Sequence, residues 1–410
     1  MNRLEAENGE RIENTESEKW IEDSTVISKL AQRLDSGKPA DVICLDVDGT
    51  VYEKIQKPDG SWEKKGDNRE LSRKLQAENI PCILISGRPD WNEACEQEMQ
   101  DLGLIAPDVI IAGGGSIIYW RNKDGTLIAD KEFLRIMREQ KVSEKKEPGR
   151  EEFIYDPTII ADTLDTELAE FSQDGFETVR VDTNSGVGFT TVDITDMKFE
   201  KLSLIVEKIR NIFSGVKVTF SEDLEKVSAD SFSGWIQVLP LAGGKDGATR
   251  YALDKLGRAI NPASIDSKRL QPHIFGDASI DIWMLSLGSS ISDQYDLHQY
   301  ALGNLTPYAK AKLDRLIGAF EITPDERERI KGLIESGEIE NVEYGLRAEL
   351  TDLIKKPKSE NSRTRHDEVT AKIRELSKIA IVRDPNRRRA NLQQTTNTGP
   401  DGVFEAVSKI

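Results

Sequence analysis

Short apolar runs alternate with amphipathic stretches in the first third of the chain. The runs DVICLD (41–46), IPCILIS (80–86) and DVIIAGGG (108–115) predict buried strands. Helical periodicity over 68–78 and 91–102 separates them. Such alternation is typical of a parallel sheet covered by helices on both faces. A polar loop containing Pro-Asp-Gly is expected between the first strand and the first of these helices.

The pattern changes after about Tyr119. A hairpin is predicted with its turn at 122–125, and a helix follows at 131–140. Beyond a charged linker, ETVRVDT and GVGFTTVDI alternate with a period of two, and 199–212 is strongly amphipathic with helical spacing. VKVTFSE and GWIQVLP complete this unit. We therefore expect an α+β module inserted into one α/β domain.

The strand–helix rhythm returns at about residue 244. A helix is predicted over 245–256, a strand at HIFGD (273–277) and a helix over 281–287. The segment 307–378 is helical and charged, and its Thr-Pro-Asp-Glu sequence at 323–326 is a capping box with proline at the first helical position. Within it, KKPKSENSRTRH is poor in apolar residues and predicts a flexible linker. We expect this segment to be an accessory that could dock a protein partner.

Composition narrows the functional classes. A net charge of -17 argues against binding to nucleic acid, which needs a surplus of lysine and arginine. No apolar run approaches the ~20 residues that span a bilayer, so we expect no membrane partner. The opening residues lack the apolar stretch of a secretory signal, which predicts a cytoplasmic protein. Three cysteines without a CxxC pair and three scattered histidines favour neither a disulfide framework nor a zinc site.

Four short segments stand at or near the carboxyl ends of predicted strands, where open α/β sheets bind their ligands. The first is Asp46-Val-Asp48-Gly-Thr50, whose paired carboxylates can share a magnesium ion. The others are Ser86-Gly87-Arg88, Lys245 in the first turn of a helix, and Gly-Asp277-Ala-Ser-Ile-Asp281. Each has an ordinary structural explanation when it is taken alone: a turn, a surface lysine, or an acid that the helix dipole favours in a first turn. Together they predict a site for a phosphoryl group.

The order DVDGT, SGR, a solitary lysine and GDxxxD resembles the four motifs of the haloacid dehalogenase superfamily. The large insertion between the second and third motifs resembles the caps of its subfamily IIB, which includes Cof-type sugar phosphatases, sucrose-phosphate phosphatase and phosphomannomutase. PDVIIAGGGSIIYW, GGKDGATRYALDKLG and HIFGDASIDIWML are most similar to the sucrose-phosphatase-like branch. TGPDGVFEAV, near the end of the chain, resembles the segment that closes the core. The resemblance covers about 41–300 and the last twenty residues.

The resemblance implies a fold: a Rossmann-like α/β core with a parallel sheet, an inserted α+β cap and a helical C-terminal insertion. The implied division of the chain is an acidic N-terminal arm with a short helix (1–38), the first part of the core (39–120), the cap (121–238), the second part of the core (239–300), the helical accessory segment (301–390) and the closing segment (391–410).

The resemblance also implies roles for the motif residues. Asp46 would be the nucleophile and Asp48 the general acid and base, while Ser86 and Lys245 bind the transferring phosphoryl group. Mg²⁺ would be held by Asp46, Asp48 through its backbone carbonyl, and Asp277, with Asp281 orienting the metal site from outside it. The remaining motif residues, expected to contact the substrate, are Thr50, Gly87 and Arg88.

The predicted function is hydrolysis of a small phosphorylated metabolite through an aspartyl-phosphate intermediate. Within this class, a sugar phosphate is the expected substrate. Two alternatives stay open. A phosphosugar mutase would share every catalytic residue, and a weakly catalytic phosphosugar-binding sensor or scaffold would signal through the C-terminal helices. The fourth motif favours the second alternative slightly, because Ala278 and Ile280 stand where the common form GDSxND has serine and asparagine.

Overall fold

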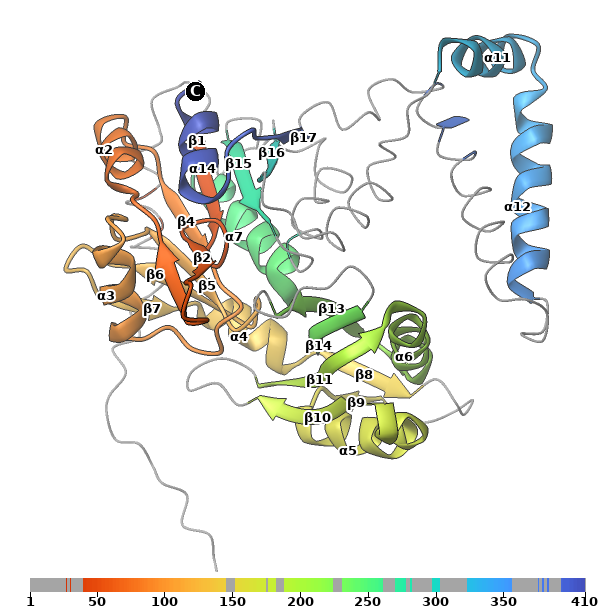
Figure 1. Ribbon diagram of the computed structural model, residues 1–410, viewed down its shortest axis with the longest axis horizontal. Helices are drawn as coiled ribbons and strands as arrows, with labels where there is room; N and C mark the ends of the chain where they lie inside the picture. Colours follow the sequence, from red (N-terminus) through yellow and green to blue (C-terminus); the bar gives the residue numbers. More distant parts are fainter. Residues whose placement is uncertain are drawn as a thin grey trace, which may run out of the picture.

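A computed structural model describes most of the two folded modules of the protein (Figure 1). The described residues are 27, 30, 40–144, 152–174, 176–181, 188–223, 231–260, 270–277, 281, 297–302, 323–355, 375, 378, 379, 382 and 392–409. Several expectations fall outside them: most of the N-terminal arm and its helix, the helix over 282–287, the linker after residue 355, and Ala278 and Ile280 of the fourth motif.

The described strands of the first module form one eight-stranded sheet in the order β17-β16-β15-β1-β4-β5-β6-β7. The strands from β17 to β5 pair in parallel, and β6 and β7 add an antiparallel edge. The predicted α/β class with a mostly parallel sheet is therefore confirmed. The strands are β1 (Ala40–Asp46), β4 (Cys82–Ile85), β5 (Val109–Ala112), β6 (Ile117–Arg121), β7 (Leu127–Ala129), β15 (Leu270–Gly276), β16 (His298–Ala301) and β17 (Leu392–Gln394).

Helices cover this sheet and complete its core. They are α2 (Arg69–Ala77), α3 (Glu93–Asp101), α4 (Lys131–Arg138), α7 (Gly244–Ile260) and α14 (Gly399–Val407). In α2, Leu71 and Leu75 lie one turn apart and are both buried, as the amphipathic spacing predicts. The C-terminal helix α14 contacts α2 and contributes Val403 and Val407 to the core, so the last described helix packs against an early element of the first module.

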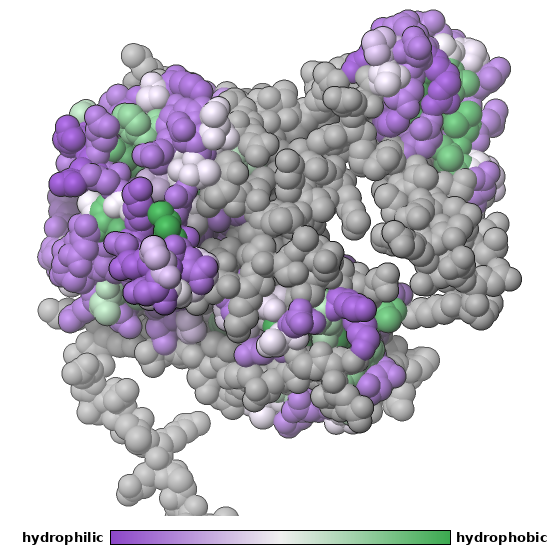
Figure 2. Space-filling view, viewed as in Figure 1, coloured by the Kyte–Doolittle hydropathy of each residue, from purple (hydrophilic) through white to green (hydrophobic). Residues whose placement is uncertain are grey.

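A hairpin replaces the polar loop expected after β1. Strands β2 (Glu53–Gln56) and β3 (Trp62–Lys65) pair antiparallel around the Pro-Asp-Gly turn. The Asp59 carboxylate accepts a hydrogen bond from the backbone of Ser61 at 2.9 Å, which stabilises the turn. The pairing was not predicted because both strands are largely exposed and carry no buried face to reveal their period. Figure 2 shows the mainly hydrophilic surface of this part of the molecule.

The second module contains two further sheets. A four-stranded antiparallel sheet has the order β10-β11-β14-β13, and a three-stranded sheet has the order β12-β8-β9. Its elements are β8 (Lys141–Glu144), β9 (Phe153–Ile154), α5 (Pro157–Glu167), the 3₁₀ helix η1 (Ala169–Asp174), β10 (Phe176–Val181), β11 (Phe189–Lys198), α6 (Phe199–Ile212), β12 (Phe213–Ser214), β13 (Val216–Glu222) and β14 (Ser231–Pro240). Helix α6 has the bounds that its amphipathic pattern predicts.

The start of the inserted module differs from the expected boundary at residue 121. Strand β7 pairs with β6 in the eight-stranded sheet, and α4 also contacts β6. The hairpin therefore extends the core sheet, and the sheets of the second module begin with β8. Alternation after Tyr119 looks the same in either sheet, so the pattern alone did not decide to which sheet the hairpin belongs.

Two C-terminal helices, α11 (Pro324–Glu335) and α12 (Ile339–Lys355), contact one another (Figure 1). They have a small core of their own. That core contains Ile330, Ile339, Ile379 and Val382. The predicted capping box is present, with Thr323 and Glu326 exchanging side-chain and backbone hydrogen bonds. Among the described helices, none combines the length and apolar character needed to cross a membrane.

Candidate active site

Three neighbouring strands of the central sheet bring the predicted motifs to one edge. Strand β1 lies between β4 and β15, and all three run in parallel. Asp46 ends β1, Ser86 follows β4 and Asp277 follows β15. All three side chains are buried. Because parallel strands present their carboxyl ends together, motifs separated by more than two hundred residues meet here.

Three aspartates form a compact acidic cluster at this edge. One carboxylate oxygen from each of Asp46, Asp277 and Asp281 lies within 4.8 Å of the others. The Thr50 hydroxyl donates to Asp277 at 3.2 Å, and the Asp277 backbone N–H donates to Asp281 at 3.2 Å. Burial, followed by repulsion from the neighbouring carboxylates, raises the pKa of Asp46 and of Asp277 well above the usual range.

Lys245 supplies the positive charge inside this cluster. Its ammonium contacts Asp46 and lies 2.6 Å from Asp281. Burial by itself would lower the pKa of Lys245, but the carboxylates of Asp281 and Asp46 outweigh burial and raise it, so the lysine stays charged. Lys245 lies in the first turn of α7, where the positive end of the helix dipole disfavours a positive charge. The two carboxylates account for its presence there.

The charges of the cluster fit a divalent cation. When all three carboxylates are ionised, one ammonium leaves two negative charges uncompensated among these four buried side chains, and this repulsion contributes to the raised pKa of Asp46 and of Asp277. Buried charge of this kind is costly unless it is neutralised. Carboxylate oxygens are the ligands that Mg²⁺ prefers, and a magnesium ion would supply the missing charge. The residues present therefore suit the metal that the sequence predicts.

Gly49 lets the loop after β1 approach this cluster. Its φ of 87° is in the left-handed region, which favours glycine, and a Cβ atom built there would overlap the Asp277 carboxylate. The loop carries Thr50, which is fully buried. A glycine is thus required here for two reasons, backbone conformation and space.

The second motif lies at the end of β4, which pairs with β1, the strand that carries Asp46. The Ser86 hydroxyl accepts a hydrogen bond from the Arg88 backbone N–H at 3.1 Å. A Cβ atom on Gly87 would meet nothing within 4 Å, so the backbone there faces open space. The Arg88 side chain instead forms a two-pronged ion pair with Glu98, with both N–O distances at 3.0 Å.

The Asp48 side chain contacts residues that the four motifs do not predict as its partners. Its carboxylate accepts a hydrogen bond from the hydroxyl of Tyr52 and lies 3.8 Å from Arg88. Tyr52 is completely buried, and its pKa is raised first by burial and then by the charge of Asp48. Tyr52 and Glu98 were missed because neither belongs to a motif. An isolated tyrosine just after DVDGT is the only sequence signal that points to Tyr52.

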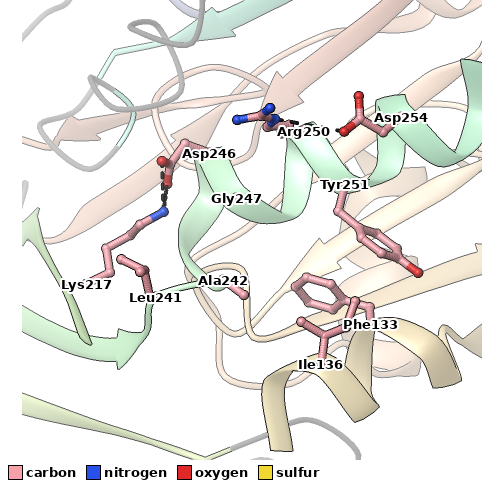
Figure 3. A pocket seen from close by; sticks show the side chains of 10 residues that line it. All are labelled: Phe133, Ile136, Lys217, Leu241, Ala242, Asp246, Gly247, Arg250, Tyr251 and Asp254. Atoms are coloured by element: carbon pink, nitrogen blue, oxygen red, sulfur yellow. Dashed lines mark hydrogen bonds and ion pairs between the residues drawn. The ribbon is translucent and has the colours of Figure 1, made fainter. Parts of the chain in front are cut away.

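A separate pocket of about 340 Å³ opens beside α7 and α4 (Figure 3). Phe133 and Tyr251 form its aromatic wall, and an ion pair between Lys217 and Asp246 closes another side at 2.9 Å. Its lining residues are Phe133, Ile136, Lys217, Leu241, Ala242, Asp246, Gly247, Arg250, Tyr251 and Asp254. These residues differ from those of the four motifs, so we assign the candidate active site to the acidic cluster.

Comparison of the chain with known sequences assigns it to no family. No protein-family model matches the chain. Among curated proteins, an uncharacterized lipoprotein of Mycobacterium leprae (strain TN) is 32% identical over 94 residues. The match covers 20% of this chain and 17% of the length of that relative.

Several solved structures are similar to this chain at low sequence identity. The sucrose-phosphatase of Synechocystis sp. PCC6803, solved with sucrose and phosphate, is 12% identical, with 91% of this chain and 98% of that chain covered and a TM-score of 0.49. A haloacid dehalogenase-like hydrolase of Bacillus subtilis is 16% identical over 67% of this chain and 85% of its own, with a TM-score of 0.35.

A phosphatase of the haloalkanoate enzyme superfamily from Bacteroides thetaiotaomicron is 14% identical, with 67% and 88% of the chains covered and a TM-score of 0.33. The roles assigned below rest on the geometry of the site.

Proposed function

We propose that this protein is a magnesium-dependent phosphatase of the haloacid dehalogenase type, which hydrolyses a small phosphorylated metabolite through an aspartyl-phosphate. One observation carries the proposal: a buried nucleophile candidate, Asp46, shares one cluster with Lys245, Asp277 and Asp281 at the carboxyl edge of a parallel sheet. A carboxylate nucleophile beside a cation site can attack an anionic phosphoryl group, because the cation offsets the repulsion between the two negative charges.

In the first half of the reaction, an Asp46 carboxylate oxygen attacks phosphorus in line with the ester oxygen. The new O–P bond forms as the ester P–O bond breaks, and the electron pair of that bond goes to the leaving oxygen. Asp48 gives its proton to this oxygen, so an alcohol leaves. In the second half, Asp48 takes a proton from water, the water oxygen bonds to phosphorus, and the Asp46–phosphorus bond breaks to release phosphate.

The remaining residues stabilise charge and position. Lys245 and Ser86 would bind the phosphoryl oxygens, which is the larger part of catalysis in phosphoryl transfer. Thr50, Gly87 and the Arg88 backbone would complete the phosphate site. Asp46, Asp277 and the backbone carbonyl of Asp48 would hold Mg²⁺, with Asp281 orienting the site. The metal, when bound, offsets the negative charge that develops on the phosphoryl group.

The proposed substrate is a sugar phosphate. The chain reaches the second module through α4 and β8 and returns through β14 into Lys245, so this module is joined to the core beside the site. The buried Gln237 of β14 lies against Gly114 in the glycine turn after β5. A module in this position could act as a cap that closes over the substrate, excludes water and sets specificity. A protein partner for α11 and α12 stays a prediction.

The test is phosphate release from sugar phosphates, nucleotides and aryl phosphates, with Mg²⁺ or with EDTA. We expect turnover that needs magnesium and falls at least about a thousandfold in Asp46→Asn. Asp254→Asn, which alters a half-exposed ion pair outside the cluster, is the matched control and should retain activity. Turnover that survives Asp46→Asn would contradict the nucleophile, and activity only with a sugar bisphosphate activator would favour the mutase.

A further inference from the structure

The Asp48 carboxylate stands at one end of a continuous chain of polar contacts. Asp48 accepts from the Tyr52 hydroxyl, and that hydroxyl lies 3.2 Å from an Arg88 nitrogen. Arg88 is paired with Glu98, which is also paired with Lys64 of β3 at 2.6 Å. The chain connects the loop after β1, the second motif, α3 and the β2–β3 hairpin.

Local backbone geometry turns Tyr52 back toward Asp48. The Gly49 N–H donates to the Tyr52 carbonyl at 2.9 Å, and the Val51 N–H donates to the Val47 carbonyl at 3.0 Å. Asp48 and Tyr52 also form an isolated β-bridge. The tyrosine ring is fully buried, and the Lys64 ammonium lies 4.9 Å from its centre. Burial and these contacts restrict the hydroxyl to one position.

Donor and acceptor chemistry fixes the direction of this chain. An arginine side chain has only donors, so the Tyr52 oxygen must accept from Arg88. The single hydrogen of the phenol is then left to donate to Asp48. Glu98, bonded through both of its oxygens, keeps the guanidinium in the required orientation. Asp48 is only partly buried, with 37% of its side chain exposed, so it needs such a partner to hold one rotamer.

We propose that Tyr52 is a positioning residue for Asp48, held in place by the Arg88–Glu98 ion pair. The inference rests on the proposed function, because it assigns Tyr52 to the proton transfer that Asp48 performs. It also gives the Arg88 side chain a role different from phosphate binding. The hydrogen bond directs Asp48 to the leaving oxygen and contributes most where that oxygen needs a proton.

Two classes of ester separate this role from a merely structural one. An alkyl phosphate, such as a sugar phosphate, releases a strongly basic oxygen that must be protonated as the P–O bond breaks. An activated aryl phosphate, such as p-nitrophenyl phosphate, releases a stable phenolate and needs little help from a general acid. Damage to the fold or to phosphate binding would slow both esters alike.

The experiment measures kcat and KM for both esters in Tyr52→Phe, Glu98→Gln and the wild-type protein. We expect Tyr52→Phe to lower kcat/KM about tenfold for the alkyl ester and less than about twofold for the aryl ester. The parameter kcat/KM reports the first half of the reaction, in which the two esters differ, and leaves out the second half, which they share. Glu98→Gln should shift the same ratio in the same direction by a smaller factor. Tyr344→Phe is the matched control, since that tyrosine is 77% exposed on α12, and it should leave both rates unchanged.

The outcomes separate the two proposals. Equal losses of kcat/KM on both esters, or no loss in Tyr52→Phe, would overturn the positioning role while magnesium-dependent turnover still supports the phosphatase. A wild-type protein that hydrolyses neither ester would overturn the proposed function, and the role of Tyr52 with it. Should Tyr52→Phe fail to fold, Glu98→Gln keeps the test decisive, because its ester ratio must then change.

Discussion

Gly115 packs directly against the backbone of Gly244, so the turn after β5 touches the chain just before Lys245. The φ of Gly115 is 95°, and a Cβ atom there would overlap the Gly244 carbonyl and lie 2.6 Å from the Lys245 nitrogen. The neighbouring Gly114 N–H donates to the Ser86 carbonyl at 3.1 Å. This turn therefore connects the second motif with the third.

Replacing Gly115 with alanine should destabilise the protein and displace Lys245. Left-handed backbone in a residue with a side chain costs about 1–2 kcal/mol, and overpacking a closed site adds about 1–3 kcal/mol. Gly125→Ala is the matched control, because Gly125 has a φ of 87° and nothing near its Cβ position. Urea unfolding should show a loss for Gly115→Ala that exceeds the control by about 1–3 kcal/mol. Equal losses would show that the contact with Gly244 is unimportant.

Lys245→Met should lose activity and stability together. The substitution removes the ammonium and leaves three buried carboxylates without it, and breaking a buried ion pair in this way costs about 3–5 kcal/mol. Lys57→Met is the control, since Lys57 pairs with Glu63 on the surface, where an ion pair contributes at most about 1 kcal/mol. Urea unfolding in EDTA measures the stability of both variants, and phosphate release measures their activity. A Lys245→Met protein as stable as the control would mean that the cluster is not charged as described.

Magnesium should stabilise the folded protein even without substrate. A ligand that binds only the folded state at a hundred times its dissociation constant adds about 2.7 kcal/mol. Thermal unfolding with and without Mg²⁺ should therefore show a higher Tm in its presence. Asp277→Asn should abolish the increase, and Asp254→Asn should keep it, because Asp254 lies outside the cluster. An increase that persists in Asp277→Asn would place the metal elsewhere.

Asp130 should prove more important to stability than an ordinary helix cap. Its fully buried carboxylate caps α4 through the Phe133 N–H and also accepts from Trp120 and Lys255, both at 2.8 Å. Asp130→Ala leaves the Trp120 and Phe133 donors unpaired and takes from Lys255 the nearer of its two carboxylates, so we expect a loss of about 3 kcal/mol or more.

The matched control for Asp130 is Asp156→Ala. Asp156 caps α5 through the Thr158 N–H at 2.7 Å but is exposed, and loss of such a cap costs about 1 kcal/mol. Urea unfolding compares the two variants. Similar losses would mean that the contacts of Asp130 with Trp120 and Lys255 contribute nothing beyond the cap.

Local patterns predicted the helices that bury one face and the strands that are buried on both faces. Helix α6 has the bounds that its apolar spacing indicates, and the capping box at Thr323 starts α11 as expected. The buried strands β1, β4 and β5 were found from their apolar runs. Strands β16 and β17 were not predicted, because they are short and obtain their place only by pairing with β15 and with each other.

Local sequence patterns alone indicate which residues could carry the chemistry. Asp46 is indicated as one of two carboxylates just past a strand end, where they can share a magnesium site. Asp277 is indicated because an unpaired charge at the end of a buried strand is costly, and Lys245 because the helix dipole disfavours a lysine in a first turn. Only the strand order of the folded sheet shows that β4, β1 and β15 are neighbours, which brings these motifs together. The folded structure also shows that Asp48 is held by Tyr52, Arg88 and Glu98. Side-chain contacts between distant segments depend on strand order and register, and neither is encoded in any local pattern.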